Sequence, residues 1–433
     1  MNPLRQLFGG RGANAGQYGM IIALVAIIII FEFWTHGLTL NPTNVINVFQ
    51  QYSYILIMAL GMVMVIIAGH IDLSVGSVAA FVGIIVAQAM SVWHFSWWEA
   101  VILGLVVGAL VGAWQGFWVA FVRVPAFIVT LAGQLIFRGA NQLIGNSTSV
   151  AVPDDYQKIG SGFIPDFGPN TGFSNGTLIL GLVTIAALIW MEMRGRARRR
   201  KMGAELPPLW VSFVRTGILV AVTLVATYLF AAGSAGTSFP IVAIIMGLLT
   251  ILYGFITRNT VFGRQVYAVG GNANAAALSG VNIRKVNFFV MANMSLLAAI
   301  AGMVYVGYAG ASGPADGTGW ELDAIAAVFV GGAAVSGGIG TVAGSIIGAL
   351  VMALLANGLQ LVGVESNLQQ IIRGLVLLLA VAFDVYSKTQ GRPSLIGGLL
   401  RGAGIGRKDP EAPAPAAVEQ PQSIDDQSKV SLP

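Results

Sequence analysis

The chain has 433 residues, of which 56% are hydrophobic and only 9% are charged, whereas soluble domains carry about 25% charged residues. This composition excludes a soluble globular protein and predicts an all-α, polytopic integral membrane protein. The absence of cysteine excludes disulfides, and the net charge of +5 indicates membrane topology rather than a nucleic-acid partner, because the basic residues lie in loops beside apolar runs.

Twelve apolar runs follow one another along the chain, and we expect ten to twelve transmembrane helices from them. The runs are Tyr18–Trp34, Tyr52–Ala68, Val75–Trp93, Glu99–Ala120, Ala126–Ile144, Thr177–Met193, Phe213–Phe230, Pro240–Thr257, Val286–Tyr308, Asp323–Val335, Thr341–Leu361 and Leu368–Tyr386. The run at Thr177 is short, and the run at Asp323 is too short to span a membrane alone. Together they predict a transmembrane domain over residues 18–386.

The charges give the predicted orientation. Of the 23 Lys and Arg residues, 20 fall in segments that alternate to the inside when the N-terminus is cytoplasmic. Only Lys158 falls in an external loop, while Arg138 and Arg373 lie within spans. We therefore expect both termini to be cytoplasmic. The predicted segments outside the spans include a cytoplasmic N-terminal segment 1–17, an external loop 145–176, a basic cytoplasmic loop 194–212, a cytoplasmic loop 258–285 and a disordered, Pro- and Ala-rich cytoplasmic tail 387–433.

A weak internal repeat is suggested by two stretches, DLSVGSVAAFVG from Asp72 and DAIAAVFVGGAA from Asp323. Each is followed by glycines at spacing four, which lie on one helix face. The two ladders are Gly104, Gly108, Gly112 and Gly116, and Gly340, Gly344 and Gly348. Duplicated halves are common in transporters. Glycine ladders alone, however, are better explained as surfaces on which helices pack closely.

The loop from Gly263 to Arg284, GRQVYAVGGNANAAALSGVNIR, is polar and lies between two long apolar runs. Its Ala-rich centre, Asn274–Leu278, is a good helix former, and the glycines at Gly270, Gly271 and Gly280 bracket it. One interpretation is a short helix that projects from the membrane and is bound by a partner. The other is an ordinary loop that connects two helices.

Signatures of an enzyme are absent from the sequence. The three histidines, His36, His70 and His94, have no metal-ligand spacing. The glycine-rich stretch Gly331–Gly344 lacks the Lys-Ser/Thr ending of a phosphate-binding loop. We therefore predict no metal, no cofactor and no ATP site in this chain.

Polar side chains recur at helical spacing within two of the spans. They are Thr130, Gln134, Arg138 and Asn141 in one span, and Glu365, Gln369 and Arg373 in the other. Polar groups inside a membrane are costly, which makes them candidates for a substrate pathway. Hydrogen bonds to neighbouring helices, or pairing across the bundle, would explain the same pattern.

Two acidic residues, Asp72 and Asp323, lie where apolar runs begin. A carboxylate in that position can accept hydrogen bonds from the free backbone N–H groups of a helix N-terminus. We expect both residues to be structural caps. A role in proton relay is the alternative.

Four stretches together resemble the inner-membrane permeases of bacterial ABC importers for monosaccharides, the ribose, xylose, arabinose and galactoside group. They are GHIDLSVGS from Gly69, RVPAFIVTLAGQLIFRG from Arg123, GRQVYAVGGNANAAALSGVN from Gly263 and ELDAIAAVFVGGAAVSGGIGTVAGSIIGAL from Glu321. The VPAFIVTLAG stretch and the extra region Asn175–Gly236 look most like the xylose and multiple-sugar branch.

The resemblance implies a permease subunit of the bacterial inner membrane that imports xylose or a related sugar. It implies three protein partners: a separate ATPase subunit, a periplasmic sugar-binding protein and a second permease copy. The family's ATPase-contacting loop corresponds to Asn272–Gly280, which makes the candidate coupling residues Asn272, Asn274, Ala277, Leu278, Ser279 and Gly280. Relatives often have an arginine before LSG, and this chain has alanines there.

Two other classes of protein fit the sequence less well. An ion-coupled secondary sugar transporter would need a buried acidic relay, and we expect Asp72, Asp323 and Asp384 to lie near span ends instead. A membrane-embedded enzyme is disfavoured because no histidines or acids cluster in the sequence.

Overall fold

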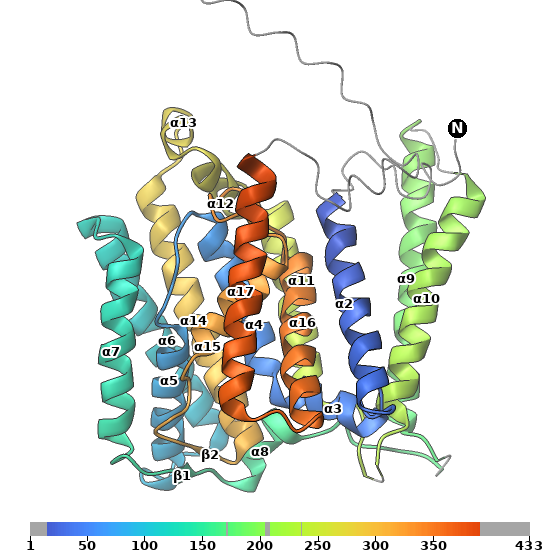
Figure 1. Cartoon of the computed structure of the whole chain (residues 1–433), viewed down its shortest axis with the longest axis horizontal. Helices are drawn as coiled ribbons and strands as arrows, with labels where there is room; N and C mark the ends of the chain where they lie inside the picture. The colour runs from blue at the N-terminus through green and yellow to red at the C-terminus, as the bar shows by residue number, and fades with distance from the viewer. Residues whose placement is uncertain (1–14, 170–171, 204–207, 235, 390–433) are drawn as a thin grey trace, which may run out of the picture.

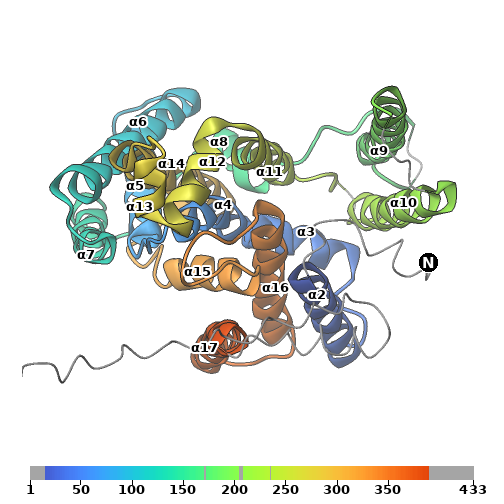
Figure 2. The same cartoon turned by 90° about the horizontal axis from the view of Figure 1, so that it is seen from above.

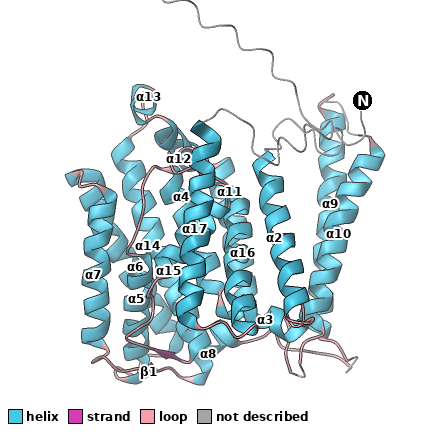
Figure 3. Ribbon diagram, viewed as in Figure 1, coloured by secondary structure: helices cyan, strands magenta, loops and turns pink. Residues whose placement is uncertain are grey.

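The computed structural model describes residues 15–169, 172–203, 208–234 and 236–389, with side chains described for 19–382 of these. The first 14 residues and the tail from residue 390 therefore lie outside the described part, as does the side chain of Asp384. Within the described part nearly every element is a helix (Figures 1 and 3). The exception is an antiparallel pair of two-residue strands, β1 (Val150–Ala151) and β2 (Ala311–Ser312).

Each of the twelve predicted apolar runs overlaps a helix, although the run Asp323–Val335 is helical only as far as Val330. In chain order these helices are α2 (Ala15–Trp34), α4 (Ser53–Ile67), α5 (Val75–Ser91), α6 (Trp97–Phe117), α7 (Ala126–Ile144), α9 (Asn175–Lys201), α10 (Leu209–Ala231), α11 (Ile241–Asn259), α14 (Ile283–Ala309), α15 (Trp320–Val330), α16 (Val342–Leu361) and α17 (Ser366–Thr389). The remaining helical elements are α3 (Pro42–Gln51), the π-helical turn η1 (Trp118–Val122), α8 (Asp154–Ser161), α12 (Val261–Gly271) and α13 (Ala273–Leu278).

Seven of the described helices are long and apolar enough to cross a membrane, or eight if the bent pair α3–α4 is one span. The pair bends by 49°. Gly19–Trp34, Val75–Ser91 and Ser366–Ala382 are shorter apolar helices. The all-α, polytopic class is confirmed. The number of spans depends on how these short and broken helices are counted.

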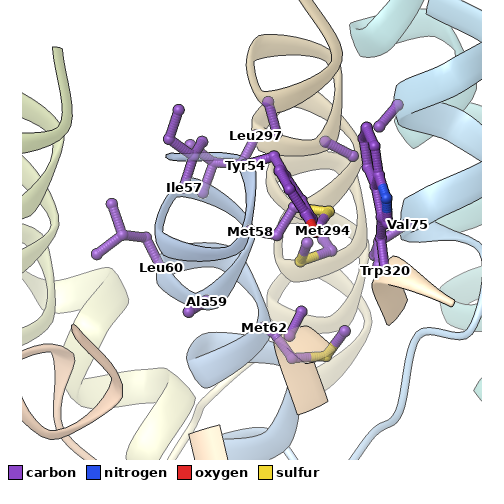
Figure 4. Close-up of a cluster of buried hydrophobic side chains, with 14 of the residues drawn as sticks. Tyr54, Ile57, Met58, Ala59, Leu60, Met62, Val75, Met294, Leu297 and Trp320 are labelled. Atoms are coloured by element: carbon purple, nitrogen blue, oxygen red, sulfur yellow. The ribbon is translucent and has the colours of Figure 1, made fainter. Parts of the chain in front are cut away.

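The core of the molecule surrounds α14, which packs against α4, α5 and α6. All residues of α4 are buried, and its side chains interdigitate with those of α14 (Figure 4). Tyr54 of α4 stacks on Trp320 of α15 with ring centroids 4.1 Å apart, which joins α15 to the same core. Because α15 has only 11 residues and most of them are buried, it lies inside the bundle without spanning it alone.

Both glycine ladders are packing surfaces. A Cβ atom at Gly108 would lie 2.4 Å from Ala299 Cβ, and one at Gly112 would lie 2.6 Å from Ala292 O, so α6 and α14 approach backbone to backbone. In the second ladder, a Cβ at Gly348 would lie 1.9 Å from Ala327 O of α15. The packing interpretation therefore accounts for both ladders.

The predicted external loop includes two short elements of secondary structure. It contains β1 and α8, and α8 packs on α14. Tyr156 of α8 is completely buried, and its hydroxyl donates to Met303 O at 3.0 Å.

The hairpin of α9 and α10 stands at the edge of the molecule. α9 packs on α10, and α10 packs on α3 (Figures 1 and 2). Phe230, near the end of α10, meets Phe49 of α3 edge-on with ring centroids 5.1 Å apart. Most of the hairpin is therefore outside the bundle.

Candidate coupling helix and intramembrane polar site

The loop 258–285 folds into two helices, α12 and α13, at one end of the bundle (Figure 1). α13 is the short helix that the sequence predicts, with six residues, and it begins after Asn272. The Asn272 side chain accepts the backbone N–H of Ala275 at 2.9 Å, which caps the helix. Ser279 Oγ donates to Ala275 O at 2.9 Å at the other end. Gly280 follows with φ of +85°, which favours glycine.

All six candidate coupling residues are exposed. Leu278 is 92% exposed, the highest fraction among the exposed large hydrophobic residues. Only Ala276 of this helix is buried. α13 therefore presents an apolar side chain to its surroundings on a helix held by local hydrogen bonds.

Behind α13, α12 is packed tightly against the bundle. Tyr267 donates its hydroxyl to Gly340 O at 2.8 Å, in the glycine-rich loop between α15 and α16. A Cβ atom at Gly270 would lie 1.6 Å from Ile67 O at the end of α4. Gly338 N donates to the same Ile67 O at 2.8 Å. The helix pair thus contacts two separate parts of the core.

The first predicted polar stripe lies on α7 and faces its neighbours in the same chain. Gln134 Nε2 donates to Glu321 Oε1 of α15 at 2.9 Å. Asn141 donates to the carbonyls of Gly313 and Pro314, each at 3.4 Å, and Thr130 to Ile71 O at 3.4 Å. The stripe therefore joins α7 to α15 and to the segment before α5.

The second stripe joins α17 to α15. Arg373 pairs with Asp323, with Nη1 and Oδ2 3.1 Å apart. Gln369 Nε2 donates to Val364 O at 2.8 Å instead of reaching another helix. Pairing across the bundle, one of the two alternatives for Arg373, is present in the structure.

The prediction that Asp323 caps its helix is wrong. Gly319 is the N-cap residue of α15 and has no side chain, while Asp323 lies in the first turn and pairs with Arg373. Asp72 does accept backbone and hydroxyl hydrogen bonds, at 2.8 and 2.6 Å, but both come from Ser74, the N-cap residue of α5. It therefore supports the start of α5 from two residues upstream, and the two suggested repeats differ at this point.

The acids are also deeper than the sequence indicated. Asp72 is 0% exposed and Asp323 is 6% exposed, so a position near a span end did not place them at the surface. Glu321, which the sequence analysis did not select as a site residue, is 5% exposed. No helical spacing pointed to Glu321, because residues two positions apart lie on nearly opposite sides of a helix.

Several polar atoms around these acids are buried without a hydrogen-bond partner. They include Asp72 Oδ2, Glu321 Oε2, Arg138 Nη2 and Asn141 Oδ1. Buried polar groups in proteins are normally satisfied by protein or water. The site thus has donors and acceptors free for water or for a polar solute.

A cavity of about 580 Å³ opens between the ends of α4, η1, α7 and α14. Its lining includes His70, Arg123, Arg284 and Asn287, and Arg123 has a left-handed backbone with φ of 67° just after η1. The part of the chain that the structure describes contains no group of three His, Cys, Asp or Glu residues able to hold a metal.

Comparison with known proteins identifies relatives over most of the chain. Residues 44–381 match the family described as branched-chain amino acid transport system / permease component. The xylose transport system permease protein XylH of Haemophilus influenzae is 38% identical over 383 residues, covering 88% of this chain and 99% of the relative. The ribose import permease protein RbsC of Escherichia coli is 34% identical, covering 85% and 93%. No solved structure matches.

These relationships bear on the choice between transporter classes. Ion coupling was disfavoured because the acids were expected near span ends. Asp72 and Asp323 are buried, so that reason no longer holds. The relatives, however, are ABC-type permease subunits. The chain belongs to the branched-chain amino acid transport system / permease component family, among the permease subunits of ABC importers for monosaccharides.

Proposed function

We propose that this chain carries xylose or a related monosaccharide across the bacterial inner membrane, as the permease of an ABC importer. A separate subunit hydrolyses ATP, a periplasmic binding protein delivers the sugar, and two copies of the permease form the complex. Both termini lie in the cytoplasm, as the distribution of basic residues indicates. The choice of sugar follows the xylose permease that is 38% identical over 88% of the chain.

The observation that carries the proposal is the exposure of α13. Complete burial of a leucine side chain is worth roughly 1.5–3 kcal/mol, so Leu278 at 92% exposure is a favourable contact for a partner. Two side-chain hydrogen bonds, from Asn272 and Ser279, and the left-handed backbone of Gly280 fix the helix before the partner arrives. A preformed helix loses little conformational entropy on binding.

A displacement of α13 would reach the transmembrane core through α12. The Tyr267–Gly340 hydrogen bond leads to the loop between α15 and α16, and the contact of Gly270 with Ile67 leads to α4. ATP binding to the partner can drive this movement only if the partner binds the two permease states with different affinity.

The pathway for sugar would use the polar face of α7. Gln134, Arg138 and Asn141, with Thr130 at one end, offer amide, guanidinium and hydroxyl groups, and Gln369 and Arg373 offer similar groups on α17. Free donors and acceptors at Arg138 and Glu321 can exchange hydrogen bonds with sugar hydroxyls as they pass. The sugar would thereby replace part of its hydration shell.

The test is reconstitution of the permease with its ATPase and binding protein in liposomes. Leu278→Asp should abolish co-purification of the ATPase and reduce sugar uptake more than tenfold, because it places a charge in an apolar contact. Phe167→Asp, at a 56% exposed site in the loop before α9, is the matched control and should leave both unchanged.

A second variant examines Gly280, which follows the end of α13. Gly280→Val forces a β-branched residue into a φ of +85°, so it should uncouple hydrolysis from uptake while the ATPase remains bound. Normal ATPase binding and normal uptake in Leu278→Asp would refute the coupling role of α13.

A further inference from the structure

The α9–α10 hairpin is apolar and exposed over most of its length. Within the most apolar 18-residue windows, only 17% of α9 and 11% of α10 is buried. Large apolar side chains near its basic end, such as Met193, Phe213 and Ile218, are 65%, 73% and 59% exposed. These side chains are positioned to contact acyl chains, independently of any sugar or ATPase.

The same end of the hairpin is strongly basic. Between Glu192 and Arg215 the sequence has seven basic residues and two acidic ones. The positive-inside rule explains why such residues gather beside a span. It does not explain why side chains from both helices converge on one cavity.

That cavity has a volume of about 80 Å³ and lies between α9 and α10. Arg196 and Arg199 line it from α9, and Arg215 lines it from α10. Arg196 Nη1 donates to Ser212 Oγ at 2.5 Å, which fixes one wall. Glu192 also lines the cavity, so among its described lining residues three arginines accompany one carboxylate.

The other arginines of the segment are placed differently. Arg194 lies over the ring of Trp190, with Cζ 4.9 Å from the centroid, and Arg198 and Arg200 do not line the cavity. Within the described residues, neither Arg199 nor Arg215 forms an ion pair. The cavity thus has two arginines available to an anion from the membrane.

We propose that this basic cavity binds the phosphate of an anionic phospholipid, whose acyl chains lie along the exposed apolar faces of α9 and α10. The planar guanidinium group matches phosphate by paired hydrogen bonds. The exposed apolar side chains at this end of the hairpin, such as Met193, Phe213 and Ile218, favour a lipid phosphate over free phosphate. A free phosphate ion would leave these side chains without an apolar contact.

Native mass spectrometry of the full chain, purified in detergent, tests this proposal. Cardiolipin or phosphatidylglycerol should be retained in preference to phosphatidylcholine. Because each substitution removes a charge-assisted hydrogen bond from guanidinium to phosphate, Arg199→Gln/Arg215→Gln should weaken binding by more than about tenfold. Arg198→Gln/Arg200→Gln removes the same charge from the same segment outside the cavity and should leave the affinity unchanged.

Three results would overturn the proposal. Equal losses in the two double variants would mean diffuse attraction without a site. Equal retention of phosphatidylcholine would mean that the headgroup charge is not recognised. Displacement of the lipid by inorganic phosphate at matched concentration would identify free phosphate as the ligand. Thermal unfolding of both variants should match that of the parent protein, so that a loss of binding is not a loss of fold.

Discussion

Helices α14 and α9 have the same length, 27 residues, and their most apolar windows have the same mean hydropathy. Yet 67% of the window in α14 is buried and only 17% of that in α9. In lipid the surroundings of a helix are as apolar as a protein core, so hydrophobicity alone does not bring helices together. Hydropathy therefore predicts that both helices lie in the membrane, but it does not predict which of them packs against other helices.

Small residues make the difference. α14 includes Ala298, Ala299, Ala301 and Gly302 in one stretch, and all four are buried against neighbouring helices. The backbone of α6 can approach this surface because its own contact positions are glycines. On α9, by contrast, Gly181 meets Thr227 of α10, and much of the remaining surface is covered by large exposed side chains. Close backbone approach adds dispersion contacts that large side chains prevent.

The largest effect is expected from adding a large side chain at a glycine of α6, compared with the same change at a glycine of α10. Gly112→Leu should destabilise the protein by more than the about 1–3 kcal/mol typical of overpacking, since its Cβ would meet the backbone of Ala292. A Cβ atom added at Gly217 of α10 would meet nothing within 4 Å. Gly217→Leu should therefore leave stability unchanged or slightly higher. Thermal unfolding in detergent compares the two. Similar losses in both variants would show that α10 is packed after all.

A smaller loss of stability is expected from breaking the ion pair between Asp323 and Arg373. Asp323→Asn leaves Arg373 without its partner and should cost about 2–3 kcal/mol, below the range for a fully buried pair because the Arg373 side chain is 27% exposed. The double variant Asp323→Asn/Arg373→Gln should recover part of that loss, which a double-mutant cycle would measure.

The control for this cycle is the exposed pair of Lys158 and Asp155, with side chains 68% and 73% exposed. Lys158→Ala should produce no resolvable change in unfolding, because water screens the pair. If the cycle at Asp323 gives no coupling, the ion pair does not hold α17 to α15.

Removing the hairpin should have little effect on the stability of the bundle. Ser174 N donates to Ala231 O at 3.1 Å, so the two ends of the hairpin lie together. Replacing Gly176–Tyr228 with a short Gly/Ser linker should leave the unfolding temperature of the bundle nearly unchanged while removing anionic lipid binding. Phe230 is kept for its contact with Phe49. A large drop in unfolding temperature would make the hairpin part of the folding unit.

The candidate site was predictable only in part. The sequence predicted α13 through its Ala-rich centre and flanking glycines, since propensity and capping act over a few neighbouring residues. It selected Arg373 as a polar residue in a span and left its partner open. Asp323 was assigned to capping because the helix was expected to begin there, whereas α15 begins at Trp320. That displacement of three residues also hid Glu321.

The sequence by itself determined the class of the protein, the approximate places of the twelve apolar helices and the short helix α13, because these follow from local hydrophobicity and turn chemistry. Only the tertiary structure decided which helices form the core, that Asp323 pairs with Arg373, and that Arg196, Arg199 and Arg215 line one cavity. The reason is physical: these features depend on contacts between residues far apart in the chain, and local propensity carries no information about such distances.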